Sequence, residues 1–105
     1  MEVYQTADGK QPFANWLRGL KDEQARSRIR VRIARLQLGN LGDCKSVGGG
    51  LLELRIDHGP GYRVYFARRG DTLVLLLCGG DKRAQARDIK QARAYLTDYE
   101  QRVKP

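Results

Sequence analysis

Four side chains suited to acid–base chemistry or anion binding alternate along two neighbouring apolar runs. Glu53 and Arg55 occupy every second position of the first run, and Arg63 and Tyr65 do the same in the second. Because side chains of a β-strand alternate between its two faces, each pair lies on one side of its strand. If the chain turns at Gly59-Pro60, the two pairs face each other across a hairpin.

Two more cations, Lys82 and Arg83, follow the next apolar run, where a strand is expected to give way to a helix. Guanidinium and ammonium groups bind phosphate, and a carboxylate or phenol beside them can move a proton. A sheet face with several cations, one carboxylate and one phenol therefore predicts a phosphate-binding surface. Glu53 is the natural candidate for a base and Tyr65 a weaker one, whereas His58 in the turn is a candidate acid.

Each of these residues also has a purely structural interpretation. Arg63 and Glu53 can form an ion pair within the sheet. Tyr65 can serve as a cross-strand packing residue. His58 and Lys82 can be exposed residues beside a turn and a helix. The residues alone leave both interpretations open.

The elements that must position these side chains follow from apolar spacing and turn residues. They predict the order strand, helix, helix, strand, strand, strand, helix over 3–6, 12–19, 22–38, 52–57, 62–67, 72–78 and 84–103. The expected fold class is α+β, a single domain over 1–105. A small, mainly antiparallel sheet packs against the N-terminal helical pair and the C-terminal helix. The glycine-rich segment 39–50 predicts a flexible connection, and 69–71 predicts a turn.

The second expected helix carries a row of arginines beside its apolar stripe. Arg28, Arg32 and Arg35 stand at i, i+4 and i+7, a spacing that places them on one helical face. A basic ridge of this kind can track the phosphates of a nucleic acid, so these three residues and Arg83 are candidate nucleic-acid-binding residues. The ridge can equally be a solvated helix face.

The chain as a whole is basic, with 20 Lys and Arg against 12 Asp and Glu and a formal net charge of +8. Such a balance favours a polyanionic partner, because binding a polyanion releases its counterions. A basic but merely solvated surface is the alternative. Charge therefore predicts binding but no reaction.

Ligand counts and apolar runs exclude several classes of protein. Two cysteines, Cys44 and Cys78, and the single His58 are too few for a typical zinc site, so neither a metal nor a cofactor is expected. Cys78 ends an apolar run and is expected to be buried. No apolar run approaches the roughly 18 residues of a membrane span, and the first residues lack a signal-peptide pattern. The expectation is a cytoplasmic protein.

Three stretches of the chain carry a family resemblance. They are Leu52-Glu-Leu-Arg55, Gly59-Pro-Gly-Tyr-Arg-Val-Tyr-Phe66, and Leu75-Leu-Leu-Cys-Gly-Gly-Asp-Lys82 followed by Gln85 and Asp88-Ile89. Together they resemble the RelE/ParE toxin superfamily, and within it the HigB-like, phage-related addiction-module killer proteins. The likeness extends over nearly the whole chain, because the opening strand and the helical pair follow the family's order.

The resemblance implies the toxin of a type II toxin–antitoxin system. Such a toxin, when free of its helix-turn-helix antitoxin, enters the ribosomal A site and cuts mRNA without a metal. Arg63 matches the family's strand arginine, which contacts the scissile phosphate, and Arg55 matches a basic residue on the preceding strand. Lys82, or Arg83 one step on, matches the cation at the end of the last strand. The implied partners are the antitoxin, the ribosome and mRNA. RNA is then the nucleic acid that the candidate binding residues Arg28, Arg32, Arg35 and Arg83 would contact.

The chain departs from the RelE pattern at the positions of the base and the acid. Glu53 stands where those enzymes carry a second lysine, and Gln85 and Asp88 stand where they carry a tyrosine. Two other functions are therefore considered. ParE-like members share the fold but act on DNA gyrase without cutting RNA. A catalytically weak relative would only bind nucleic acid.

Overall fold

The computed structural model describes residues 1–70 and 73–103. Within these ranges the chain forms β1 (Glu2–Val3), α1 (Pro12–Gly19), α2 (Glu23–Gln37), β2 (Cys44–Gly48), β3 (Leu51–Ile56), β4 (Tyr62–Arg69), β5 (Leu73–Asp81), the short 3-10 helix η1 (Lys82–Ala84) and α3 (Gln85–Arg102). Two expectations fall in part on residues outside these ranges: the last residue of the expected turn over 69–71 and the first residue of the expected strand over 72–78.

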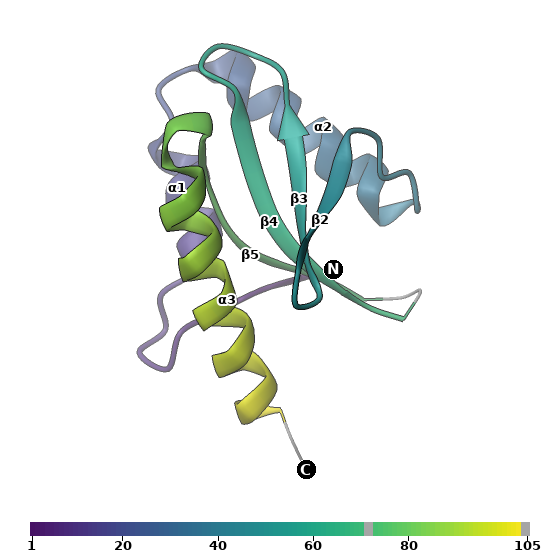
Figure 1. The fold of residues 1–105 in the computed structure, drawn as a ribbon. Helices are drawn as coiled ribbons and strands as arrows, with labels where there is room; N and C mark the ends of the chain where they lie inside the picture. The colour runs from purple at the N-terminus through teal and green to yellow at the C-terminus, as the bar shows by residue number, and fades with distance from the viewer. Residues whose placement is uncertain (71–72, 104–105) are drawn as a thin grey trace.

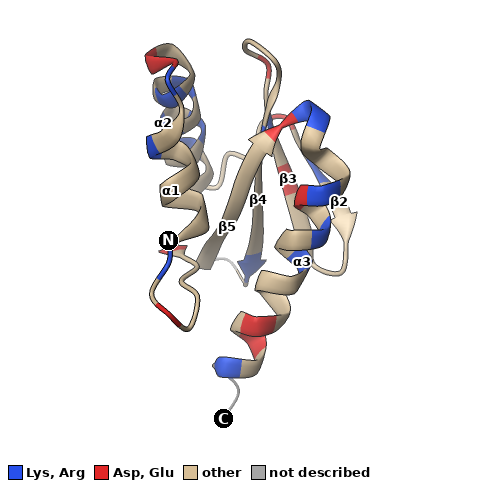
Figure 2. Cartoon of the chain, turned by 90° about the vertical axis from the view of Figure 1, so that its left-hand side faces the viewer, with Lys and Arg blue, Asp and Glu red and all other residues tan. Residues whose placement is uncertain are grey.

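The strands form one mixed sheet in the order β1-β5-β4-β3-β2. β1 runs parallel to β5, and the other neighbouring pairs are antiparallel. Helices α1 and α2 cover one face of the sheet and α3 covers the other, as the two perpendicular views in Figure 1 and Figure 2 show. The α+β class, the mainly antiparallel sheet and the placement of the helices are thus confirmed.

Each face of the sheet has its own apolar core. On one face, the central strands pack against the buried residues of the helical pair, which are Phe13, Leu17, Ala25, Ile29 and Leu36. On the other face they pack against Ala92 and Leu96 of α3. The helical spacing of these residues is what places one apolar stripe of each helix on the sheet.

β5 contributes side chains to both cores. Leu76 belongs to the core under α1 and α2, whereas Leu75 and Leu77 belong to the core under α3. Burial on both sides explains the nearly continuous apolar run of this strand and confirms the expected central strand. The register with β4 shifts at Leu77, which has no directly paired residue in β4. This bulge changes which β5 residues face α3 in the last part of the strand.

Local signals fix the starts of the first two helices and the approach of α1 to the sheet. Pro12 occupies the start of α1, where its missing N–H leaves no bond unmade. The backbone N–H of Ala25 donates to Asp22 Oδ1 (3.1 Å), which caps α2. Trp16 packs on bare backbone at Gly79, where any side chain would overlap the indole ring.

The glycine-rich segment 39–50 differs from the expected flexible connection. Cys44–Gly48 forms strand β2 at the edge of the sheet, antiparallel to β3. The glycines at 48–50 all have positive φ, which suits a hairpin connection because residues with a side chain disfavour that region. Only Cys44 and Val47 of β2 are even partly buried, so the strand has no apolar alternation by which to recognise it.

Candidate functional site

An open hollow of about 290 Å³ lies at the turn between β3 and β4. Arg55 reaches it from β3, Arg63 from β4 and Lys82 from η1. The rest of its lining is Asp43, Asp57, Gly59, Pro60 and Gly61. The structure therefore brings together the three cations that were expected to contact phosphate, with two carboxylates in the same wall.

The register between β3 and β4 sets this arrangement. Arg55 pairs directly with Arg63, and Glu53 pairs with Tyr65 two residues further along. Paired residues of antiparallel strands project on the same face of the sheet. The four side chains therefore gather on the face that α3 covers, as the alternation in the sequence predicts.

Lys82 and Arg83 follow β5 but lie in different surroundings. The N–H of Lys82 donates to the carbonyl of Gly61 (2.7 Å), which ties the end of β5 to the turn and leaves the exposed side chain on the hollow. The guanidinium of Arg83 lies 3.3 Å from the carboxylate of Asp81 and lines a separate hollow at the start of α3. Lys82, not Arg83, is thus the third cation of the hollow.

Beneath the hollow, Glu53 is a fully buried carboxylate. Its Oε2 accepts hydrogen bonds from Gln85 Nε2 (2.7 Å) and from the Tyr65 hydroxyl (3.1 Å). Its Oε1 accepts a bond from Arg55 Nε (3.3 Å), and Arg63 Nε lies 3.8 Å from Oε2. A charge removed from water needs partners of this kind. Glu53 therefore joins side chains of β3, β4 and α3 in one network.

The network keeps Glu53 ionised. Burial acts to raise the pKa of Glu53, but the hydrogen bonds, led by that from Gln85, and the charge of Arg63 outweigh it and leave this pKa below its ordinary value. An efficient base has a pKa near the working pH and contacts its substrate. Glu53 has neither property in this structure, so the geometry favours a positioning role over the expected role of base.

Tyr65 is also fully buried, and its hydroxyl is committed to Glu53. Burial and the charge of Glu53 raise the pKa of Tyr65 well above its ordinary value. The phenol therefore keeps its proton and is shielded from the hollow. This placement favours the packing interpretation of Tyr65 over proton transfer.

His58, the candidate acid, lies on the α2 side of the turn. Its Nε2 is 3.0 Å from Oδ2 of Asp22, the residue that caps α2. The pair fastens the turn between β3 and β4 to the start of α2. His58 does not line the hollow, so the structure does not bring it together with the three cations.

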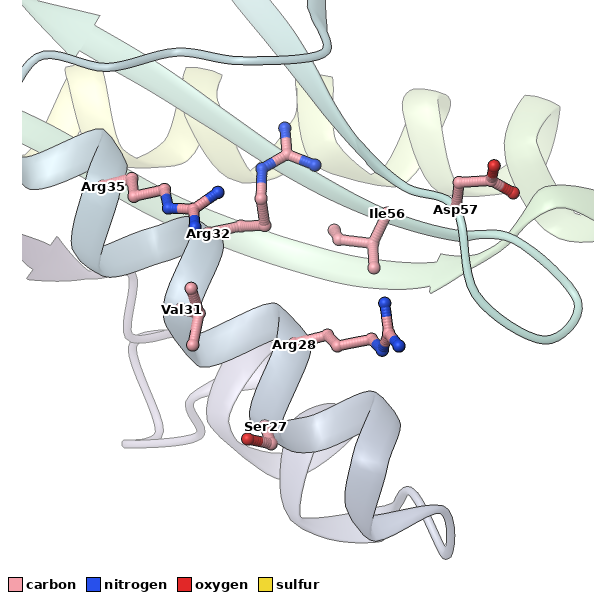
Figure 3. A pocket seen from close by; sticks show the side chains of 7 residues that line it. All are labelled: Ser27, Arg28, Val31, Arg32, Arg35, Ile56 and Asp57. Carbon is pink, nitrogen blue, oxygen red and sulfur yellow. The ribbon is translucent and has the colours of Figure 1, made fainter.

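The arginines of α2 surround a second hollow of about 360 Å³ between this helix and the end of β3, shown in Figure 3. Its lining residues are Ser27, Arg28, Val31, Arg32, Arg35, Ile56 and Asp57. Asp57 lines both hollows, so the two adjoin at the end of β3. The arginine ridge and the sheet cations therefore form neighbouring basic regions.

Arg32 differs from the other two arginines of this ridge. Its guanidinium donates to the carbonyl of Arg55 on β3 (2.6 Å) and to the carbonyl of Asp43 before β2 (3.2 Å). Arg32 thus connects α2 to the sheet, and these bonds favour a structural role for Arg32 over RNA binding. Arg28 and Arg35 are exposed, and their expected role in RNA binding stays a prediction.

Gln85 and Asp88, at the start of α3, belong to the site although neither was expected to have a role in it. Gln85 donates to Glu53, and the carboxyl group of Asp88 lies over Gly80, where any side chain would overlap Asp88 Oδ2. The sequence did carry a signal, because glycine inside a strand often marks a close approach. Only the fold shows that a carboxyl group approaches there.

The two cysteines and the acidic residues that the structure describes form no further site. Cys44 and Cys78 are free thiols, and Cys78 is buried as expected, which raises its pKa to about 12. Among residues 1–70 and 73–103, no three His, Cys, Asp or Glu side chains gather as metal ligands would. In the same ranges no helix combines the length and the apolar character needed to cross a bilayer.

A five-stranded sheet with a helical pair on one face, a single helix on the other and a cationic hollow at its turn defines a small RelE-like α+β protein. Residues 15–101 match the family described as "Phage derived protein Gp49-like". An uncharacterized protein of Haemophilus influenzae is 57% identical over 81 residues, which cover 77% of this chain and 82% of that protein. The chain belongs to the Gp49-like family, a toxin-like family related to RelE/ParE-type addiction modules.

Proposed function

We propose that the chain is a HigB-like toxin of a type II toxin–antitoxin system that cuts mRNA on the ribosome. The observation that carries the proposal is the hollow in which Arg55, Arg63 and Lys82 meet above the buried Glu53. Three cations around an open hollow suit a phosphodiester, because its negative charge becomes more concentrated as it reacts. Membership of a toxin-like family supports the same class of activity.

In the proposed reaction the ribose 2′-oxygen attacks the adjacent phosphorus, and the bond from phosphorus to the 5′-oxygen breaks. A base takes the proton of the 2′-hydroxyl, and an acid protonates the leaving 5′-oxygen. The products are a 2′,3′-cyclic phosphate and a 5′-hydroxyl. Arg63 contacts the scissile phosphate, and Arg55 and Lys82 stabilise the transition state, so the reaction needs no metal.

Glu53 and Tyr65 act on this reaction from beneath the hollow. Arg55 and Arg63 are directly paired on neighbouring strands, where like charges repel. Glu53 lies within 4 Å of both guanidinium groups, at 3.3 and 3.8 Å, and offsets that repulsion. Tyr65 holds Glu53 in place through its hydroxyl. The buried carboxylate is what allows two arginines to face one phosphate.

Outside the hollow, Arg28, Arg35 and Arg83 supply a general attraction to RNA. All three are exposed, and neutralising phosphates releases counterions. An acidic segment of a helix-turn-helix antitoxin would cover the same cations, so antitoxin and RNA would compete for them. The ribosome, mRNA and this antitoxin are the proposed partners, and the cytoplasm is the proposed place of action.

A translating extract tests this function against inhibition of DNA gyrase. We expect the purified protein to cut a reporter mRNA while ribosomes translate it and to leave gyrase supercoiling unchanged. Inhibited supercoiling with intact mRNA would overturn the proposal in favour of a ParE-like toxin. Salt-dependent RNA binding without cleavage, and with normal supercoiling, would show a relative that only binds nucleic acid.

A further inference from the structure

Two buried polar atoms on the α3 face of the sheet have no hydrogen-bond partner within the described residues. They are Nε of Arg63, a donor, and Oδ2 of Asp88, an acceptor. Buried polar groups are normally bonded, and an exception calls for a reason. Here one unpartnered atom is a donor and the other an acceptor, and the two residues belong to neighbouring elements of the fold, β4 and α3.

Gly80 shows how close these two groups are placed. It pairs directly with Arg63 across β4 and β5, and a side chain at position 80 would overlap Asp88 Oδ2. The Cβ atoms of directly opposed residues lie about 5 Å apart. The carboxyl group of Asp88 therefore fills the place of the missing side chain at position 80 and becomes the cross-strand neighbour of Arg63.

The charged groups around Arg63 indicate what Asp88 can do. Arg55 lies directly opposite Arg63 on β3 and repels it, while Glu53 attracts it from a diagonal position. Both of these groups lie on the β3 side. Asp88, on the β5 side, is a carboxyl group that can attract Arg63 from the other direction.

We propose that Asp88 is a positioning residue, which holds Arg63 from the α3 side and sets the direction in which its guanidinium reaches the phosphate. This inference rests on the proposed function for the reaction but not for the proposed attraction between the two side chains. Asp88 acts through Arg63 and is not placed in contact with RNA. Gly80 is part of the same device, since only glycine leaves room for the carboxyl group.

The hold on Arg63 depends on the charge of Asp88. Burial raises the pKa of Asp88, Arg87 acts against this shift and Asp81 adds to it. The charge on Asp88 therefore appears at a higher pH than for an ordinary aspartate. The groups that face it from the elements packed around it are Arg87 of α3, Asp81 and Cys78 of β5, and Arg63 and Tyr65 of β4.

The test compares the wild type with Asp88→Asn, which keeps the shape of the side chain but never ionises. We expect kcat for RNA cleavage to fall about tenfold or more, with little change in KM, because the arginine is present but misdirected. The acidic limb of the wild-type pH profile should disappear in the variant. Glu100→Gln, which removes an exposed carboxylate of the same helix, should behave as the wild type.

A second measurement separates this inference from the proposed function. The NMR signal of the Arg63 Nε–H is assigned by its loss in Arg63→Gln. Above pH 4.5, where Glu53 stays ionised, this signal should shift with pH in the wild type and stay constant in Asp88→Asn. If the wild type cuts no RNA, the proposed function fails, and the NMR titration alone decides whether Asp88 holds Arg63. An unchanged titration in Asp88→Asn, or wild-type kcat and pH profile in that variant, would overturn the inference.

Discussion

At the scale of single residues, the site depends on a carboxylate that water does not reach. Burying a charge is unfavourable by several kcal/mol unless partners compensate for the lost hydration. Glu53 has such partners in Gln85, Tyr65 and Arg55, and a weaker one in Arg63. The same carboxylate holds Arg55 by a hydrogen bond and attracts Arg63, so the stability of the sheet and the geometry of the hollow depend on one group.

Glu53→Gln should destabilise the protein in a pH-dependent way. Since the pKa of Glu53 is below its ordinary value of 4.5 in the folded chain, the unfolded chain takes up the proton first as the pH falls. The stabilisation is therefore complete above the ordinary value and is lost as the pH falls through the folded value. Urea unfolding should show the variant about 3 kcal/mol less stable at pH 7, with a smaller difference near pH 3.

Glu100→Gln is the matched control for this prediction. Glu100 forms an exposed ion pair with Arg69, and such pairs contribute at most about 1 kcal/mol. The control should lie close to the wild type at both pH values. A Glu53→Gln variant that unfolds like the wild type at pH 7 would disprove the organising role of Glu53.

The sequence was enough to predict on which face of the sheet the site residues lie, but not how deeply they are buried. Alternation, together with a turn at Gly59-Pro60, was enough to place Glu53 and Arg55 opposite Tyr65 and Arg63. The burial of these side chains was not predictable. The alternation along a strand does not show which part of the sheet face the helix α3 will cover. Glu53 therefore looked like an accessible base, although it is fully buried.

At the scale of elements, α2 carries one arginine that is bonded to the sheet, Arg32, and two exposed arginines, Arg28 and Arg35, that are proposed to bind RNA. Arg32→Ala should lower the free energy of unfolding by about 2 kcal/mol, because bonds from a charged group to backbone carbonyls are lost. Arg28→Ala and Arg35→Ala should leave stability nearly unchanged. Each should instead weaken RNA binding and reduce its salt dependence by about one phosphate contact.

Thermal unfolding and RNA titrations at several salt concentrations check this division of α2. A stable Arg32→Ala variant would show that its carbonyl contacts contribute little. If Arg28→Ala and Arg35→Ala both bind RNA with the wild-type salt dependence, the ridge is a solvated helix face.

The contact between α1 and β5 gives a second prediction at this scale. Gly79→Ala should destabilise the protein by about 1–3 kcal/mol, because the new methyl group overlaps the ring of Trp16. The control is Gly19→Ala at the end of α1, where a methyl group meets no atom within 4 Å. It should be neutral or slightly stabilising, by up to about 1 kcal/mol. Urea unfolding of the two variants makes the comparison, and equal stabilities would contradict it.

The order of elements was predictable wherever burial leaves a periodic pattern. α2 shows its apolar stripe, and β5 shows a continuous run because both of its faces are covered. β2 shows neither, since it lies at the edge of the sheet with three of its five residues exposed. Its pairing with β3 depends on a tertiary contact that no local pattern of residues records.

At the scale of the whole molecule, positive charge lies on both sides of the sheet. Figure 2 shows basic residues along α2 and along the first part of α3, on opposite sides of the sheet. The net charge of +8 attracts a polyanion from a distance. The proposed cleavage needs more than attraction, because it would depend on three cations at one phosphate.

Mapping of RNA 5′ ends after induced expression tests the central claim most directly. Wild type and Arg63→Ala are compared with Arg69→Ala, which removes the same group from an exposed position of the same strand. The wild type and Arg69→Ala should produce new 5′ ends within translated messages. Arg63→Ala should reduce them about 100-fold. A folded Arg63→Ala protein that cuts messages at the wild-type level would contradict the account.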